Sequence, residues 1–320
     1  MSLFLPEGVL VGHWTDRSGW TGCTAILVPE GSVVACEVRG GGPGTRETDL
    51  LGPAASAPGA NAVVLSGGSA FGLAAADGVV RHLEERGAGY RTRAGIVPLV
   101  ASAVVFDLAL GDPAARPGPE AGHAAAVAAT RGLDRGSVGA GTGCTVGKLL
   151  GPDAWTKGGL GFAGRTLAKG GTVSALAVVN AFGEVLAEDG SILAGAWRDG
   201  EYRRTVDLLA RGESPLRPWR EATTLICVLT DAALTKTQAW LVARAASAGV
   251  ARAVDPAATA VDGDVVYCVA TGRKDVDGLT LAAVAADVTA AAIRDGARQA
   301  TGAPGCPSAA DRGAGETGAS

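Results

Sequence analysis

Several short stretches of this chain are apolar at every consecutive position rather than at every second one. The clearest case is residues 225–229, LICVL, which threonines flank on both sides. A strand with one face in water alternates polar and apolar residues, so a continuous run predicts a strand that is covered on both faces. Further strands are expected at residues 24–28, 33–38, 61–65, 173–179 and 265–270.

Three stretches have the spacing of helices. They cover residues 69–86, 236–247 and about 278–298, and Ser69 and Thr235 stand where they could cap the first two. The strand–helix–strand–helix order after residue 223 predicts mixed layers of sheet and helix. A single domain over residues 1–300 is expected, followed by a tail of small residues, 301–320, that is expected to be disordered.

Bulk properties exclude several classes of partner. The formal net charge of the 320 residues is −4 and no basic run occurs, so nucleic acid is not an expected partner. No stretch of about 18 apolar residues occurs, which argues against a membrane span. The N-terminus lacks the pattern of a signal peptide, and six cysteines without a CxxC pair fit a reducing compartment, so the protein is expected in the cytoplasm.

The histidines give no sign of a metal site. The chain has only His13, His82 and His123, and no two of them have ligand spacing in the sequence. No metal and no organic cofactor are therefore expected.

A charged segment runs from about residue 188 to residue 222 and meets the apolar strand abruptly at Thr223. We interpret the segment as an exposed linker. A linker that enters a buried strand directly is what a self-processing junction would look like, while a plain surface loop is the more common explanation. Thr223 can equally be an ordinary strand residue or a nucleophile.

Other motifs are ambiguous when each is taken alone. Residues 66–72, SGGSAFG, nearly match a serine-hydrolase elbow, but Phe71 stands where the final glycine belongs. Asn180 ends an apolar strand, where its amide could donate to an oxyanion or form a turn. Asp262 and Asp264 are two apart, so they share one face of a strand or belong to a turn.

Seven stretches in order resemble the L-aminopeptidase/D-esterase family of self-processing N-terminal nucleophile hydrolases, whose relatives include β-peptidyl aminopeptidases and nylon-oligomer endohydrolases. They cover most of the chain, from about residue 9 to residue 272. These stretches are VGHWTD with TGCTAIL, RGGGPGTRETDLL, NAVVLSGGSAFGLAAADGVVRHLEERG, GSVGAGTGCTVGKLLG, VVNAFGEVL, TTLICVLTDAALTKTQ and DGDVVYCVATG.

The resemblance implies an α+β fold, a four-layer αββα sandwich. It implies that the precursor cleaves itself between Ala222 and Thr223, into chains 1–222 and 223–320 that interleave in one domain. Thr223 would be the nucleophile, and its free α-amine the base. The resemblance also assigns Asn180 to the oxyanion, Asp262 and Asp264 to the new ammonium and hydroxyl, and Lys148 to the site.

The expected activity is hydrolysis of a small peptide or amide substrate, in the manner of an aminopeptidase. Two alternatives stay open: an endo-acting amidase of the nylon-oligomer type, and an uncleaved binding protein on the same fold. Two departures from the family pattern bear on them. Ala222 stands where Thr-type precursors usually carry Asn or Gly, and Phe106 stands where aminopeptidase members place a tyrosine. The family also implies a homo-oligomer of four or more chains.

Overall fold

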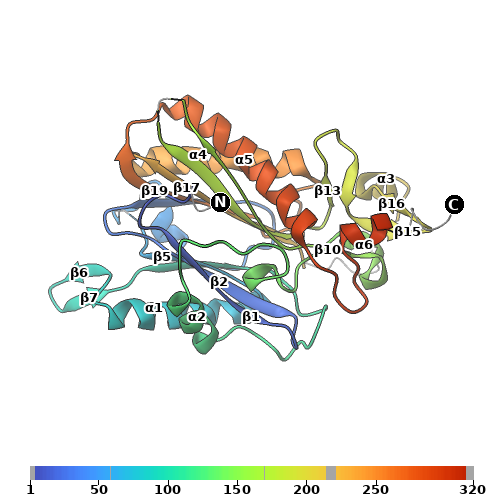
Figure 1. Ribbon diagram of the computed structural model, residues 1–320, viewed down its shortest axis with the longest axis horizontal. Coiled ribbons are helices and arrows are strands. Elements are labelled where there is room, and N and C mark those ends of the chain that lie inside the picture. The colour runs from blue at the N-terminus through green and yellow to red at the C-terminus, as the bar shows by residue number, and fades with distance from the viewer. Residues whose placement is uncertain (1–3, 58, 169, 214–220, 315–320) are drawn as a thin grey trace.

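A computed structural model describes residues 4–57, 59–168, 170–213 and 221–314. Two five-stranded sheets lie face to face, with helices on both outer sides (Figure 1). Helices α1 (Ala75–Glu85) and α2 (Pro119–Val127) pack on the first sheet, and α4 (Lys236–Ala253) and α5 (Gly278–Gln299) pack on the second. The fold is therefore the expected α+β, αββα sandwich.

Each sheet combines strands that are distant in the sequence. The first has the order β1-β2-β5-β8-β4 and the second β11-β12-β17-β19-β3. The strands of the first sheet are β1 (Leu10–Asp16), β2 (Thr21–Leu27), β5 (Ala62–Ser66), β8 (Val100–Val104) and β4 (Thr45–Arg46). Those of the second are β11 (Leu160–Thr166), β12 (Thr172–Asn180), β17 (Thr223–Ala232), β19 (Val265–Lys274) and β3 (Val33–Val38).

Strand β17 has the two covered faces that its continuous apolar run predicts. Leu225, Cys227 and Leu229 point into the core between the two sheets. Ile226 and Val228 point into the core between the second sheet and helices α4 and α5. A third apolar cluster lies between the first sheet and helices α1 and α2, so a separate apolar core lies between each pair of adjacent layers.

Most neighbouring strands run antiparallel, but β5 pairs with β8 and β17 pairs with β19 in parallel. Parallel neighbours need a crossover, and helices α1 and α4 supply it on opposite outer faces. Helix α4 begins at the expected cap, because Thr235 and Gln238 form a reciprocal capping box. The expectation for Ser69 is wrong: its side chain makes no capping bond, and it opens a 3₁₀ turn, Ser69–Ala74, ahead of α1.

The segment before Thr223 is more structured than a linker. It contains the short strands β14 (Ile192–Ala194), β15 (Ala196–Arg198) and β16 (Glu201–Arg203), and helix α3 (Thr205–Ala210). Glu184, in β13 (Glu184–Leu186), is fully buried and accepts the backbone N–H of Thr205, which anchors this helix. Residues 214–220 lie outside the described residues.

The C-terminal region also differs from expectation up to residue 314. Residues 309–314 form helix α6 (Ala309–Ala314), and the preceding Cys306 and Ser308 are buried. The Arg312 guanidinium donates to the carbonyl oxygen of Trp155, which holds this segment against the body of the protein. The remaining part of the expected tail, residues 315–320, lies outside the described residues.

Small elements complete the chain. They are β6 (Tyr90–Thr92), β7 (Gly95–Val97), β9 (Thr145–Val146), β10 (Thr156–Lys157) and β18 (Val254–Asp255), with 3₁₀ turns at Asp49–Leu51, Gly139–Gly141, Lys148–Leu150 and Pro152–Ala154. None of the helices in the described ranges combines the length and the apolar character that crossing a bilayer requires.

Candidate active site

Thr223 is the first residue of a central strand of the second sheet. It faces Asn180, the last residue of β12, in antiparallel register. The preceding residue, Ala222, forms a parallel bridge with Asp262, just before β19. Because three strand ends meet here, residues that are 40 or more positions apart in the sequence come together.

The Ala222 carbonyl has two donors. The Thr223 hydroxyl lies 2.6 Å from the Ala222 carbonyl oxygen, and the backbone N–H of Gly263 donates to the same oxygen at 2.9 Å. Both residues that form this peptide bond are buried, Thr223 at 5% exposure and Ala222 at 3%. The hydroxyl is thus held beside a polarised carbonyl and away from bulk water.

Asn180 and Lys148 hold the next carbonyl upstream. The Lys148 ammonium donates to the Glu221 carbonyl oxygen at 2.6 Å and to Asn180 Oδ1 at 2.9 Å. Asn180 Nδ2 donates to the carbonyl oxygens of Phe106, at 3.0 Å, and Glu221, at 3.3 Å. In the uncut chain the Asn180 amide therefore donates to the Glu221 carbonyl, and the backbone donor to the Ala222 carbonyl is Gly263.

Burial shifts the pKa of the Lys148 amine. Its removal from water lowers the pKa from 10.5 to about 8, and the nearby acids, Glu221 and Asp262 among them, oppose that shift. An amine in this range exchanges its proton near neutral pH more readily than an exposed lysine does.

The two acids, Asp262 and Asp264, are both buried and both hydrogen-bonded. Asp264 accepts the backbone N–H groups of Thr224, at 2.6 Å, and Ala258, at 3.0 Å. Asp262 accepts the backbone N–H and the hydroxyl of Thr259. Burial raises the pKa of both carboxyl groups, and the neighbouring Asp262 adds to the rise at Asp264. A positive charge that appeared beside them would relieve that cost.

The structure brings together all five residues that the sequence analysis proposed, Thr223, Asn180, Lys148, Asp262 and Asp264. Sequence reasoning missed Gly263, whose backbone reaches the Ala222 carbonyl. A Cβ on Gly263 would lie 3.0 Å from the Thr223 hydroxyl and 2.6 Å from the carbonyl oxygen of Gly42. The signal was present in the sequence, because a glycine between two buried acids permits such a close approach.

A second missed residue is Asp107, which follows Phe106. Its buried carboxylate accepts the Thr21 hydroxyl and the Gly68 N–H, both at 2.7 Å. These bonds fix the chain at Phe106, whose carbonyl in turn orients the Asn180 amide.

A cavity of about 800 Å³ opens beside this cluster. Its lining is mostly apolar and includes Phe106, Trp155 and Phe182, while Glu221 and Ala222 form part of its wall. Lys148 and Glu221 are the only charged residues among the described lining residues. The cavity can accept an apolar group next to the Ala222 carbonyl.

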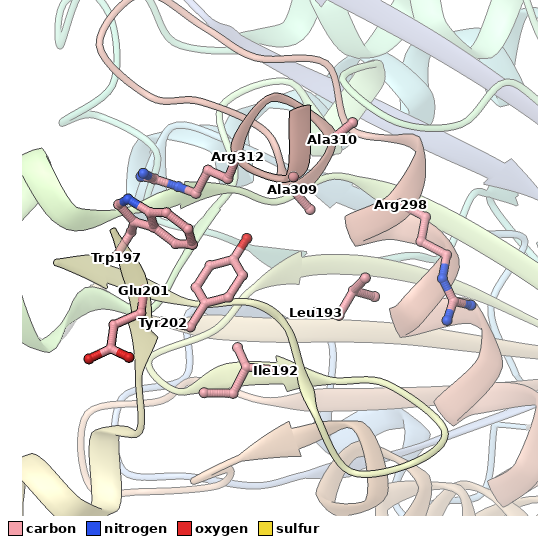
Figure 2. A pocket seen from close by; sticks show the side chains of 10 residues that line it. Ile192, Leu193, Trp197, Glu201, Tyr202, Arg298, Ala309, Ala310 and Arg312 are labelled. Carbon is pink, nitrogen blue, oxygen red and sulfur yellow. The ribbon is translucent and has the colours of Figure 1, made fainter. Parts of the chain in front are cut away.

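A second cavity, of about 480 Å³, lies between the β15–β16 hairpin, the end of α5 and α6 (Figure 2). Trp197, Tyr202 and Arg312 stand together at one side of it, with the Arg312 guanidinium over the Trp197 ring. Among the residues that the structure describes, it shares no lining residue with the first cavity, and none of the five proposed site residues lines it.

The cysteines are not candidate nucleophiles at this site. All six cysteines are unpaired and buried. Cys144 is the cysteine nearest in sequence to Lys148, and burial raises the pKa of its thiol to about 12, so it stays protonated.

Comparison with known proteins assigns the family. The model of peptidase family S58 matches residues 7–308. The chain belongs to peptidase family S58. Membership in this family makes it a hydrolase of peptide or amide bonds, in agreement with the resemblance noted in the sequence.

Two relatives show the range of the family. An uncharacterised aminopeptidase of Mycobacterium tuberculosis (strain ATCC 25618 / H37Rv) is 42% identical over 281 residues, which cover 83% of this chain and 80% of the relative. A 6-aminohexanoate-oligomer endohydrolase of a Kocuria species is 29% identical, over 91% of this chain and 84% of the relative.

A solved structure supports the fold of this S58 member. The L-aminopeptidase D-Ala-esterase/amidase of Ochrobactrum anthropi, described as a variant of the Ntn hydrolase fold, superposes with a TM-score of 0.73. The alignment covers 97% of this chain and 95% of the other at 20% identity, so it speaks for the fold alone.

Proposed function

We propose that this chain is a self-processing amide hydrolase, aminopeptidase-like, whose nucleophile is Thr223 after cleavage of the Ala222–Thr223 bond. The observation that carries the proposal is the 2.6 Å separation between the Thr223 hydroxyl and the Ala222 carbonyl oxygen, together with the Gly263 N–H on that same oxygen. A nucleophile beside a carbonyl whose oxygen already has a fixed donor is the arrangement that acyl transfer requires.

Processing would proceed by an N-to-O acyl shift. The Thr223 hydroxyl oxygen attacks the Ala222 carbonyl carbon, the hydroxyl proton passes to the Thr223 nitrogen, and the C–N bond breaks to leave an ester. Water then hydrolyses the ester. The products are a chain that ends in the Ala222 carboxylate and a chain that begins with the free amine of Thr223.

Turnover would use that new amine as the base. A free α-amine has a pKa of about 7.7–8.0, so at neutral pH it can accept the hydroxyl proton while the oxygen attacks a substrate amide. The substrate amine leaves with that proton, and water hydrolyses the acyl ester on Thr223. The scheme requires no histidine.

The proposal also assigns a role to each of the neighbouring side chains. Once residues 221–222 move aside, the Asn180 amide, which now donates to Glu221, becomes available for the oxyanion of the substrate. Asp262 and Asp264 would balance the new ammonium, because an unpaired buried charge is costly. Lys148 would hold Asn180 through its bond to Oδ1.

A denaturing gel with N-terminal sequencing tests the proposal. In the ratio 222:98 of 320 residues, the 31.6 kDa chain should give fragments of roughly 22 and 10 kDa, the smaller beginning TTLIC. Thr223→Ala should stay whole, and Thr223→Ser, which keeps a hydroxyl, should still cleave. A wild-type chain that stays whole for days would support an uncleaved binding protein instead.

The cavity favours a second candidate, an endo-acting amidase. The acyl part of a substrate would occupy the space beside Ala222, where the described lining offers one cation, Lys148, and one acid, Glu221, which belongs to the segment that would move aside after cleavage. An exo-acting aminopeptidase needs an acid for the free ammonium of its substrate. Hydrolysis of a free peptide and of its N-acetylated form distinguishes the two candidates. An endo-acting enzyme should cleave both forms, whereas an exo-acting aminopeptidase should cleave only the free peptide.

Assembly as a homo-oligomer of four or more chains and a cytoplasmic location stay predictions from the family resemblance and the composition.

A further inference from the structure

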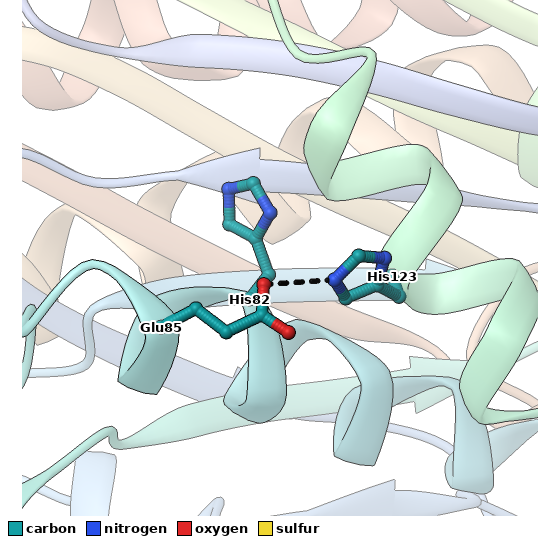
Figure 3. A group of neighbouring side chains, drawn as sticks. All are labelled: His82, Glu85 and His123. Atoms are coloured by element: carbon teal, nitrogen blue, oxygen red, sulfur yellow. Dashed lines mark hydrogen bonds and ion pairs between the residues drawn. The ribbon is translucent and has the colours of Figure 1, made fainter.

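Two of the three histidines of this chain meet a carboxylate between the outer helices of the first sheet. His82 and Glu85 lie one turn apart on α1, and His123 lies on α2 (Figure 3). This group could not be predicted from the sequence, because 41 positions separate the two histidines; only the packing of α1 against α2 brings them together.

The three side chains already have much of the geometry of a metal site. One donor atom from each lies within 4.8 Å of the other two, and His123 Nε2 is 3.1 Å from Glu85 Oε2. In a tetrahedral zinc site with bonds of about 2.0–2.1 Å, the donors are about 3.3 Å apart. The Glu85 and His123 donors are close to that spacing, and the His82 donor, within 4.8 Å of both, would have to move toward them to complete the site.

The surroundings allow a metal to enter. The side chains of His123 and Glu85 are 25% and 50% exposed, whereas His82 is buried. Arg86 donates to His82 Nδ1 at 3.2 Å and occupies part of the space that a cation would use. Because Arg86 is itself exposed, it can swing into solvent. Arg81, the other nearby cation, is already paired with Glu120.

We infer that His82, Glu85 and His123 form a binding site for a divalent transition metal, with Zn²⁺ as the ion best suited to two imidazoles and one carboxylate. A water molecule would complete the tetrahedron. The site would join α1 to α2 across the outer layer, while Thr223 belongs to the other sheet. Its role would be to stabilise this helix pair and not to hydrolyse amide bonds.

Calorimetric titration of ZnCl₂ into untagged, chelator-treated protein tests the inference. We expect one ion per chain and, at a hundredfold excess over the dissociation constant, a rise in Tm of roughly 5 °C. With Co²⁺ as the probe, visible absorption bands should report nitrogen and oxygen ligands in a four-coordinate site. No saturable binding, or several weak ions per chain, would overturn the inference.

Variants locate the ion. His123→Ala and Glu85→Gln should each weaken binding by at least about tenfold, whereas Glu84→Gln, a charge-matched change at the exposed neighbour on α1, should leave it unchanged. Arg86→Ala should tighten binding roughly two- to tenfold, because it removes a competing cation. Equal affinity in all four variants would place the ion elsewhere. Amide hydrolysis by these variants should stay at the wild-type rate, so the result is independent of the proposed function.

Discussion

The hydroxyl of Thr223 and the backbone N–H of Gly263 contact the same atom, the carbonyl oxygen of Ala222, from 2.6 and 2.9 Å. The first is the group that would attack this carbonyl, and the second the group that would stabilise the oxyanion formed by the attack. Both positions follow from strand pairing, because β17 and β19 run parallel and Ala222 bridges to Asp262.

Gly263→Ala should slow self-cleavage. The added Cβ would crowd the Thr223 hydroxyl and the Gly42 carbonyl, so the N–H of residue 263 would move off the Ala222 oxygen. Losing one oxyanion donor costs about 10²–10³ in rate. The fraction cleaved is followed over time on gels. Gly278→Ala is the matched control, since a Cβ there meets nothing within 4 Å; equal cleavage in both variants would remove Gly263 from the reaction.

Asn180→Asp should separate the donor role of this side chain from its acceptor role. The aspartate keeps an oxygen for the Thr145 N–H and the Lys148 ammonium, but it loses both N–H bonds that Asn180 now makes to carbonyls. In processed enzyme we expect kcat to fall by about 10²–10³ for both Asn180→Asp and Asn180→Ala. A lower Tm with normal activity per folded molecule would instead make Asn180 a structural residue.

Lys148→Met should slow processing by about 10- to 100-fold. Methionine fills similar space but cannot donate to the Glu221 carbonyl or to Asn180 Oδ1, and a hydrogen bond from a charged group contributes about 1.5–3 kcal/mol. Lys236→Met is the control, because Lys236 donates to backbone carbonyls that include Leu50 and is not part of this cluster. A Lys148→Met chain that matures at the wild-type rate would contradict the prediction.

The uncut precursor, trapped by Thr223→Ala, should lose stability as the pH rises through the acidic range. Burial and the neighbouring Asp262 raise the pKa of Asp264 from 3.8 to about 7. Between these values the folded chain keeps a proton that the unfolded chain has released, so the free energy of unfolding falls as the pH rises.

Urea unfolding of the trapped precursor at about pH 5 and about pH 7.5 measures this loss. Asp264→Asn in the same background should reduce the pH dependence, and part of the slope that is left should come from the other acids whose pKa burial raises, Asp262, Asp107, Glu184 and Glu221. An unchanged slope would mean that Asp264 stays ionised in the folded precursor.

The sequence by itself determined the layered character of the fold. The run from Leu225 to Leu229 requires cover on both faces, and the structure provides one core on each side of it. The helix cap at Thr235 could also be predicted from the sequence, because its partner, Gln238, is three residues away. Both features depend on local periodicity or on residues that are close in the sequence, so they can be recognised without the tertiary structure. Ser69 shows the limit of such reasoning, since its side chain caps nothing in the structure.

The tertiary structure decided which distant groups meet. Five candidate residues were proposed from motifs that resemble the family, but their contacts depend on the register of β12, β17 and β19, which no short stretch encodes. Glycine has no side chain, so no motif in the sequence identified the Gly263 N–H as a hydrogen-bond donor. His82 and His123 lie on separate helices, and only the packing of α1 on α2 makes them neighbours. Register and helix packing are set by the summed burial of many apolar side chains, so they emerge only when the whole core forms.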